Sequence, residues 1–284
     1  MLRIFTDTAA NVPPHLLEQY HITAMPLTYL LDGQPTELVG HDYYEAMRKG
    51  AEVKTSLVSP ALIRDTMESA LKDGDDVLYI AISGGISGTC WSAELMAEEL
   101  RSEYPDRMIR VLNTCGASLG EGLVVLEAAK MLEKGCTADE IIRQAEENCG
   151  RMRQFFMVDD LKYLRRGGRI SAAAQVAGSL LKIKPILQSD PEGHIIQHSK
   201  VRGQLKAMET LAELYKEYAV DGTRTVGIAH ADCPDGALRL QAKLRDAGQT
   251  GEILSVCYEP VTGGHVMTQS QYQWLVVSGR EINM

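Results

Sequence analysis

A segment rich in glycine and hydroxyl side chains, residues 83–89 (SGGISGT), is the part of this sequence best suited to bind an anion. It follows an apolar, strand-like run at 77–82 and precedes a helix-like run. Glycines let a backbone approach a ligand, amides at a helix N-terminus point outward, and serine and threonine hydroxyls add donors. The segment therefore predicts either a site for a carboxylate or a phosphate, or a capped turn that binds nothing. The helical spacing after it rests on Ala93, Met96, Ala97 and Leu100.

An enzymatic role for this segment has to be weighed against its spacing. Gly85-Ile86-Ser87-Gly88 lacks the residue that separates serine from the second glycine in the nucleophile elbow of serine hydrolases. The chain has no Walker A pattern with its phosphate-binding lysine, which weighs against a phosphotransferase. An enzyme that uses Ser87 or His265 remains the second hypothesis, beside a protein that only binds its ligand.

Composition and charge exclude several other classes. The 284 residues are enough for two domains, and 45% of them are hydrophobic. A net charge of −9 argues against a nucleic-acid partner, because phosphate binding favours a basic surface. The six cysteines form no CxxC pair and the seven histidines are dispersed, so neither a disulfide framework nor a metal site is expected. No apolar run is long enough for a membrane span and no signal-peptide pattern is visible, so we expect a cytoplasmic protein.

The first half of the chain predicts alternating strands and helices. Strand-like runs at 2–6, 77–82 and 108–112 alternate with helix-like runs, one of them opened by Ser59 before Pro60. A second helix begins with the capping box at 137–140. Such alternation favours a mainly parallel sheet. Smaller predictions are a hairpin over 25–33, buried positions Ile63, Met67 and Leu71 on one helix, and buried positions Ile142, Ala145 and Cys149 on another.

The second half has a different character. A short helix at 161–166 ends at Gly167-Gly168, and two strands at 184–187 and 194–196 flank the turn at 190–193. Further strands and helices follow, which together read as α+β. We therefore predict an α/β domain over 1–153 and an α+β domain over 154–284. The later elements are a helix with Leu205, Met208, Ala212 and Tyr215, strands at 225–229, 252–257 and 272–278, and a helix at 235–247.

Seven motifs, taken in order, carry a family resemblance: residues 5–10 (FTDTAA), Thr55-Ser56 with Ser59-Pro60, 82–89 with Ser92-Ala93, 160–170 (DLKYLRRGGRI), 184–187 (KPIL), 200–202 (KVR) and 264–266 (GHV). Each motif alone is weakly specific, but the ordered set covers nearly the whole chain. With this set, the sequence resembles the DegV family of bacterial lipid-binding proteins. The resemblance implies a two-domain DegV-like α/β fold, with a long-chain fatty acid enclosed between the domains.

The resemblance also implies a function and a set of site residues. Members act as the fatty-acid-binding subunit of bacterial fatty acid kinase, a carrier without catalytic residues, cofactor or metal; a separate ATP-binding subunit phosphorylates the bound carboxylate. Carried over by position, Thr55, Ser87 and His265 would bind the carboxylate. Arg169 would lie near the headgroup opening and Arg202 on the face that meets the kinase subunit. Ser56, Gly85 and Gly88 would lie beside the headgroup.

The chain departs from the family pattern at two places. Leu57-Val58 replaces a frequent Gln-Pro, and residues 267–269 (MTQ) replace a frequent Gly-Pro-Gly after the histidine. A lipid-binding sensor or structural module without kinase coupling is therefore a third hypothesis. The small residues at 172–178 either line a lipid tunnel or allow ordinary close helix packing.

Overall fold

The computed structural model describes residues 1–158, 161–170, 183–266 and 273–278, the last of these as backbone only. The chain divides into two compact units: Met1–Thr28 with Ser56–Gly150, and Tyr29–Thr55 with Arg151–Met284. The boundary predicted at 153/154 lies close to the third point where the chain passes from one unit to the other, at 150/151, but the prediction left 29–55 in the first half. That segment belongs to the second unit because its strands form a separate small sheet and its helix packs on an element near the C-terminus. No single cut in the sequence could have produced this division.

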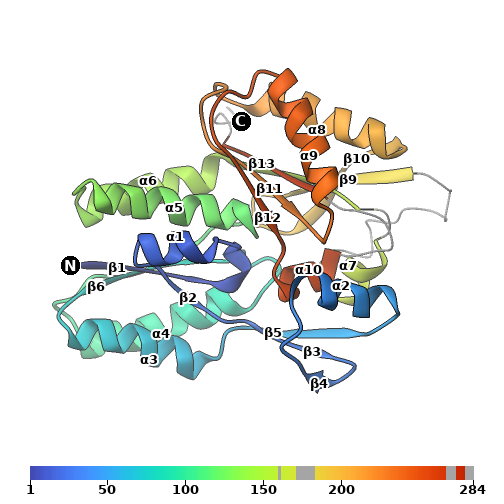
Figure 1. Cartoon of the computed structure of the whole chain (residues 1–284). Coiled ribbons are helices and arrows are strands. Elements are labelled where there is room, and N and C mark those ends of the chain that lie inside the picture. Colours follow the sequence, from blue (N-terminus) through green and yellow to red (C-terminus); the bar gives the residue numbers. More distant parts are fainter. Residues whose placement is uncertain (159–160, 171–182, 267–272, 279–284) are drawn as a thin grey trace. The chain divides into compact units, whose positions relative to one another are not determined.

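The first unit contains a four-stranded sheet in the order β2-β1-β6-β7, in which every pair is parallel. This confirms the parallel sheet predicted from the alternating pattern. The central strands are apolar on both faces, as parallel strands covered by helices must be. Helices α3 and α4 cover one face and α5 the other (Figure 1). The strands are β1 (Leu2–Asp7), β2 (Thr23–Met25), β6 (Asp76–Ala81) and β7 (Ile109–Asn113).

The helices of this unit follow the sequence signals with one exception. Ser59 and Pro60 open α3 as predicted, and the capping box before α6 is present, with the Thr137 amide donating to Glu140 Oε2 at 2.8 Å. The predicted face of α6 is correct at Ala145, which is buried, but Ile142 and Cys149 are only half-buried and Ile141 is fully buried instead. The helices are η1 (Thr8–Ala10), α1 (Pro14–Gln19), α3 (Pro60–Lys72), α4 (Thr89–Glu103), α5 (Leu119–Glu133) and α6 (Ala138–Arg151).

The predicted hairpin over 25–33 is displaced in the structure. Met25 ends β2, which pairs with β1, whereas the hairpin joins β3 (Thr28–Leu31) to β4 (Gln34–Pro35). Asp32 and Gly33 form its turn with φ of 51° and 78°, the left-handed pair that a two-residue hairpin turn requires. Strand β5 (Val53–Ser56) completes a three-stranded sheet in the order β4-β3-β5.

The second unit has a six-stranded mixed sheet in the order β10-β9-β8-β13-β11-β12. The strand nearest the C-terminus, β13, lies inside this sheet, antiparallel to both β8 and β11. The predicted strands at 184–187 and 194–196 are confirmed as an antiparallel pair. The strands are β8 (Met152–Met157), β9 (Ile183–Ser189), β10 (Ile195–Arg202), β11 (Val226–His230), β12 (Ile253–Cys257) and β13 (Gln273–Ser278).

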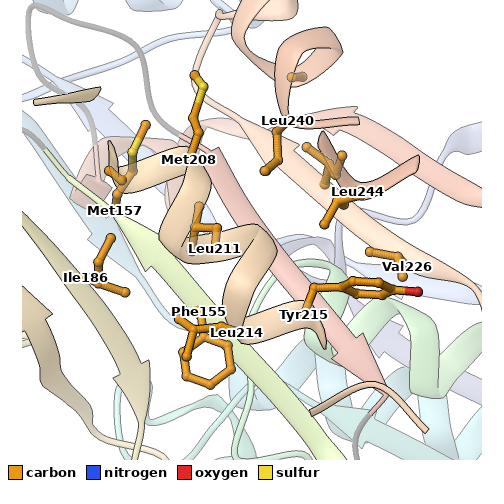
Figure 2. Packing of buried hydrophobic residues seen from close by; sticks show 13 residues of the cluster. Phe155, Met157, Ile186, Met208, Leu211, Leu214, Tyr215, Val226, Leu240 and Leu244 are labelled. Atoms are coloured by element: carbon orange, nitrogen blue, oxygen red, sulfur yellow. The ribbon is translucent and has the colours of Figure 1, made fainter. Parts of the chain in front are cut away.

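A hydrophobic core forms where α8 (Gln204–Tyr218) and α9 (Pro234–Asp246) pack on this sheet. Figure 2 shows Met208 and Leu211 of α8 together with Leu240 of α9 in the same cluster as Phe155 and Ile186 of the strands. Leu205, which we expected on the buried face of α8, is 65% exposed because that face is centred on Ala207, Leu211 and Leu214, and Leu205 points to another side of the helix.

Three short helices complete the second unit: α2 (Gly40–Arg48), α7 (Lys162–Arg166) and α10 (Pro260–Val266). Helix α10 packs on both α2 and α7. The predicted short helix before Gly167-Gly168 is confirmed, with Gly168 at φ 70°. The small-residue segment at 172–178 and residues 267–269, which depart from the family pattern, lie outside the described residues. Across the described chain, every helix is too short or too polar to cross a bilayer.

Candidate functional site

Two of the residues predicted to bind the carboxylate, Thr55 and His265, are hydrogen-bonded to each other. Thr55 lies on β5 and His265 on the last turn of α10, and Thr55 Oγ1 is 2.8 Å from His265 Nε2. Both side chains are half-buried. The pair places a hydroxyl and an imidazole side by side on the second unit, which is the kind of donor set that a carboxylate needs when it leaves water.

The surroundings of His265 keep its ring neutral at neutral pH. Burial lowers the pKa of His265 from its ordinary value of 6.5 to about 4, and the nearby Arg169 guanidinium adds to this effect. A neutral imidazole has one donor and one acceptor nitrogen. Nε2 is the nitrogen that faces Thr55. The imidazole therefore shares one hydrogen bond with Thr55 through Nε2.

Gly167 and Arg169 follow α7 and complete this group. A Cβ atom on Gly167 would lie 2.3 Å from His265 Nδ1, so only glycine lets the imidazole occupy its position. The Arg169 guanidinium donates to the Gly167 carbonyl and is half-buried, and its burial lowers the pKa of Arg169. From the sequence, Gly167-Gly168 was predicted only to end a helix, and the contact of Gly167 with His265 was not predicted.

Ser87 lies in the turn between β6 and α4 of the first unit. Its hydroxyl donates to Thr89 Oγ1 at 3.0 Å and accepts from the Thr89 amide at 3.2 Å. The turn differs from the expectation that its amides point outward. The Gly84 amide donates to Asn113 Oδ1 at 3.0 Å and the Gly85 amide to Ser83 Oγ at 3.1 Å. The amides of Ile86 and Ser87 donate to the Ser83 carbonyl, so these four donors stabilise the turn itself.

Two glycines of this turn have packing roles that their sequence pattern did not reveal. A Cβ on Gly84 would lie 2.9 Å from Trp91 Nε1, and one on Gly88 would lie 3.1 Å from Leu57 Cδ2. Asp7, at the end of β1, caps the neighbouring loop by accepting from the amides of Ala9 and Ile82 at 3.1 Å each. The side chain that remains suited to meet a ligand in this turn is the half-buried Ser87 hydroxyl.

A second serine motif was missed in the sequence. Residues 116–120 (GASLG) match the GxSxG pattern, and Ser118 has φ 53° and ψ −136°, between β7 and α5. Its hydroxyl is fully buried and donates to Asn11 Oδ1 at 2.7 Å. An amide oxygen cannot accept the proton of a nucleophilic serine as a base does. Ser118 therefore anchors the start of α5, and the geometry does not favour a serine hydrolase.

The remaining predicted residues take no part in the Thr55–His265 hydrogen bond in the part of the chain that the structure describes. Ser56 is exposed at the end of β5, and Gly85 is half-buried in the Ser87 turn. Arg202 is the exposed last residue of β10, followed by Gly203 at φ 88°. Among the described residues Arg202 makes no ion pair, as expected for a side chain at the end of an element.

One group of potential metal ligands occurs among the described residues, where none was expected. Asp190, Glu192 and His194 have ligand atoms within 4.8 Å of one another, in the turn between β9 and β10. Asp190 accepts from the His194 amide at 2.8 Å, and the His194 carbonyl accepts from the Asp190 amide at 3.0 Å. These bonds close the turn and account for the proximity of the three side chains.

Comparison with known proteins now places the chain. A family model described as "Uncharacterised protein, DegV family" matches residues 1–270. A DegV domain-containing protein of Clostridium perfringens is 36% identical over 269 residues, which cover 92% of each chain. A fatty-acid-binding DegV family protein from Thermus thermophilus has 29% identity and a TM-score of 0.86, over 98% of this chain and 99% of that one. Bacillus subtilis DegV, described as a fatty acid binding protein, has 29% identity and a TM-score of 0.84, over 97% and 98%.

The two-unit α/β structure and the sequence comparisons agree over nearly the full length. The motifs that suggested the family therefore reflect a relationship that extends through both units. This chain belongs to the DegV family.

Proposed function

We propose that this chain binds a long-chain fatty acid and presents its carboxylate to a separate, ATP-binding kinase subunit. The observation that carries the binding part is the match to fatty-acid-binding structures from Thermus thermophilus and Bacillus subtilis along nearly the whole chain. The hydrogen-bonded Thr55–His265 pair supports a site for the headgroup. The kinase part rests on the resemblance to the family.

Thr55, Ser87 and His265 are the residues proposed to bind the carboxylate. Each can donate one hydrogen bond once a carboxylate replaces its present partner in the Thr55–His265 or the Ser87–Thr89 bond. A hydrogen bond to a charged group contributes about 1.5–3 kcal/mol. Burial of each methylene contributes roughly 0.8 kcal/mol, so about fifteen of them contribute on the order of 12 kcal/mol before ordering costs. The acyl chain therefore dominates affinity, while the headgroup residues set the orientation of the carboxylate.

The proposed role in acyl-phosphate formation is presentation. A carboxylate oxygen of the bound fatty acid attacks the γ-phosphorus of ATP held by the partner, and the bond to the ADP oxygen breaks. The products are an acyl phosphate and ADP. This chain would hold the attacking oxygen in place and contribute no catalytic residue. Ser56, Gly85, Gly88 and Arg169 are proposed to surround the headgroup, and the exposed Arg202 to contact the partner.

A lipid-binding role without kinase coupling is the alternative. It is favoured by one observation, the replacement of the frequent Gly-Pro-Gly after the histidine by residues 267–269 (MTQ). Bulkier residues after His265 in the sequence would alter access of a partner to the carboxylate without removing Thr55, Ser87 or His265.

Mass spectrometry of the purified protein tests the binding proposal. Native spectra should show one added mass per chain, and extraction should identify it as a long-chain fatty acid. Recovery of only the ligand-free chain, which also fails to take up added palmitate and oleate, would contradict the proposal. Incubation of the loaded protein with ATP and a kinase subunit then separates the two roles, since a sensor retains the lipid and yields no acyl phosphate.

A further inference from the structure

Two buried tyrosines of α2 donate hydrogen bonds to the segment that carries His265. The Tyr43 hydroxyl donates to the Pro260 carbonyl at 2.7 Å, and the Tyr44 hydroxyl donates to the Tyr258 carbonyl at 3.0 Å. Both tyrosines are fully buried, and their rings meet edge to face at 5.2 Å between centroids. These bonds fix the chain immediately before and at the start of α10.

Two glycines make this contact closer than any other residue would allow. A Cβ on Gly263 would lie 2.0 Å from the Tyr44 hydroxyl oxygen. A Cβ on Gly264 would lie 2.8 Å from both the Tyr43 hydroxyl oxygen and Val53 Cγ1. Gly263-Gly264 directly precedes His265, and Val53 lies two residues before Thr55. The same contact surface thus holds both partners of the Thr55–His265 hydrogen bond.

Helix α2 is itself fixed at both ends to one carboxylate. His41 Nδ1 lies 2.9 Å from Asp232 Oδ2, and Arg48 Nη2 donates to the same oxygen at 2.6 Å. Asp232 follows β11, so these bonds attach α2 to the six-stranded sheet of the second unit. The tyrosines therefore lie on a helix that is attached to this sheet near both of its ends.

We propose that Tyr43 and Tyr44 are positioning residues, which set the place of the His265 imidazole against Thr55 through α10. This inference rests on the proposed function, in which His265 binds the carboxylate. Neither tyrosine touches the ligand in this proposal. Their hydroxyls act only through the Pro260 and Tyr258 carbonyls and through the glycine contact.

The test compares Tyr43→Phe and Tyr44→Phe with Tyr215→Phe. Tyr215 is a matched control because it is buried in the same unit and its hydroxyl donates one hydrogen bond, to Gln249 Oε1 at 2.7 Å. Each variant is labelled with 15N-histidine, and the His265 ring signals are titrated in lipid-free protein. Palmitate affinity and thermal unfolding are measured alongside.

We expect Tyr43→Phe and Tyr44→Phe to move the His265 ring signals and to raise its pKa toward the ordinary value, because a loosened α10 exposes the ring to water. Palmitate affinity should fall roughly threefold to tenfold, the range for one lost hydrogen bond. Tyr215→Phe should leave both unchanged even where it lowers the unfolding temperature equally.

The proposal is overturned if the α2 variants behave like Tyr215→Phe, with lower stability but unaltered His265 signals. Because the titration needs no fatty acid, it decides the positioning role even if the wild-type protein binds no palmitate, which would defeat the proposed function alone. If one tyrosine variant fails to fold, the other still tests the positioning of His265, because each hydroxyl donates to a different carbonyl.

Discussion

At the scale of single residues, His265 is the side chain whose chemistry depends most on its environment. Its imidazole is neutral because burial and Arg169 both oppose protonation. Ser87, by contrast, is an ordinary hydroxyl whose partner is Thr89. The contribution of His265 to stability should therefore depend on pH, unlike that of Ser87. Truncation of either side chain to alanine should weaken ligand binding to a similar extent.

Ser87→Ala and His265→Ala should each weaken palmitate binding by only about one to two orders of magnitude, because each removes one charge-assisted hydrogen bond and leaves the acyl chain buried. Acyl-phosphate formation with a kinase subunit should fall further, since transfer depends on alignment of the attacking oxygen. Binding is measured by calorimetry and transfer by product assay. Ser102→Ala and His198→Ala, on exposed side chains, serve as controls. Wild-type transfer in both site variants would show that these residues do not hold the headgroup.

The free energy of unfolding of the ligand-free protein should fall as the pH is lowered from 6.5 to about 4, between the unfolded and folded pKa values of His265. The unfolded chain binds a proton near 6.5, whereas folded His265 binds one only near 4, so protonation favours unfolding between these values. The free energy of unfolding should decline by up to about 1.4 kcal/mol per pH unit more in wild type than in His265→Gln. Denaturant titrations between these two pKa values measure this difference. Equal slopes for the two proteins would mean that His265 is not held neutral by its surroundings.

At the scale of elements, the end of α7 and the end of β10 differ in their surroundings. The α7 end lies against His265, because Gly167 leaves room for the imidazole. The β10 end presents Arg202 to solvent. One element should therefore affect ligand binding, and the other should affect only contact with a partner.

Gly167→Ala should displace the His265 ring and weaken palmitate binding, because the new Cβ would lie 2.3 Å from Nδ1. The cost should largely vanish when the same change is made in His265→Ala, since the clashing ring is then absent. Gly150→Ala is the control, as its Cβ meets nothing within 4 Å. A loss of affinity that persists unchanged in the His265→Ala background would assign the effect to the α7 backbone instead.

Arg202→Ala should leave the bound lipid in place and reduce acyl-phosphate formation with a kinase subunit. An exposed arginine at the end of an element suits bidentate contacts with a partner's carboxylates. Retained fatty acid is measured by mass spectrometry and transfer by product formation, with the exposed Arg143→Ala as control. Loss of lipid would move Arg202 into the binding site, and no change in either quantity would make it an ordinary surface residue.

At the scale of the whole molecule, the role we propose is that of a carrier. The chain offers hydrogen-bond donors for a carboxylate, and its sequence has no Walker A lysine pattern. The buried Ser118 of the GxSxG motif has an amide oxygen as its partner. In the carrier proposal, phosphoryl transfer requires a second protein.

The isolated chain should neither hydrolyse ATP nor form acyl phosphate from ATP and bound fatty acid. Both reactions need a phosphate-binding loop or a magnesium site, and the carrier proposal assigns these to the partner. Phosphate release and acyl-phosphate assays on the lipid-loaded chain check this. Robust product formation without a partner would replace the carrier by an enzyme, and the His265→Ala variant would then show whether the same site is used.

The sequence by itself determined the family and most of the strands and helices, but not α2 or α10. Apolar runs and caps such as the 137–140 box act over a few residues, so strands, helices and the parallel sheet could be predicted from local chemistry. Tertiary structure decided the rest. Only folding shows that 29–55 joins the second unit, that Gly167 makes room for His265, and that the amides of the Ser87 turn are used within it. The first two depend on contacts between residues far apart in the chain, which no local pattern encodes. The third depends on the backbone geometry of the turn, which its pattern of glycines and serines does not specify.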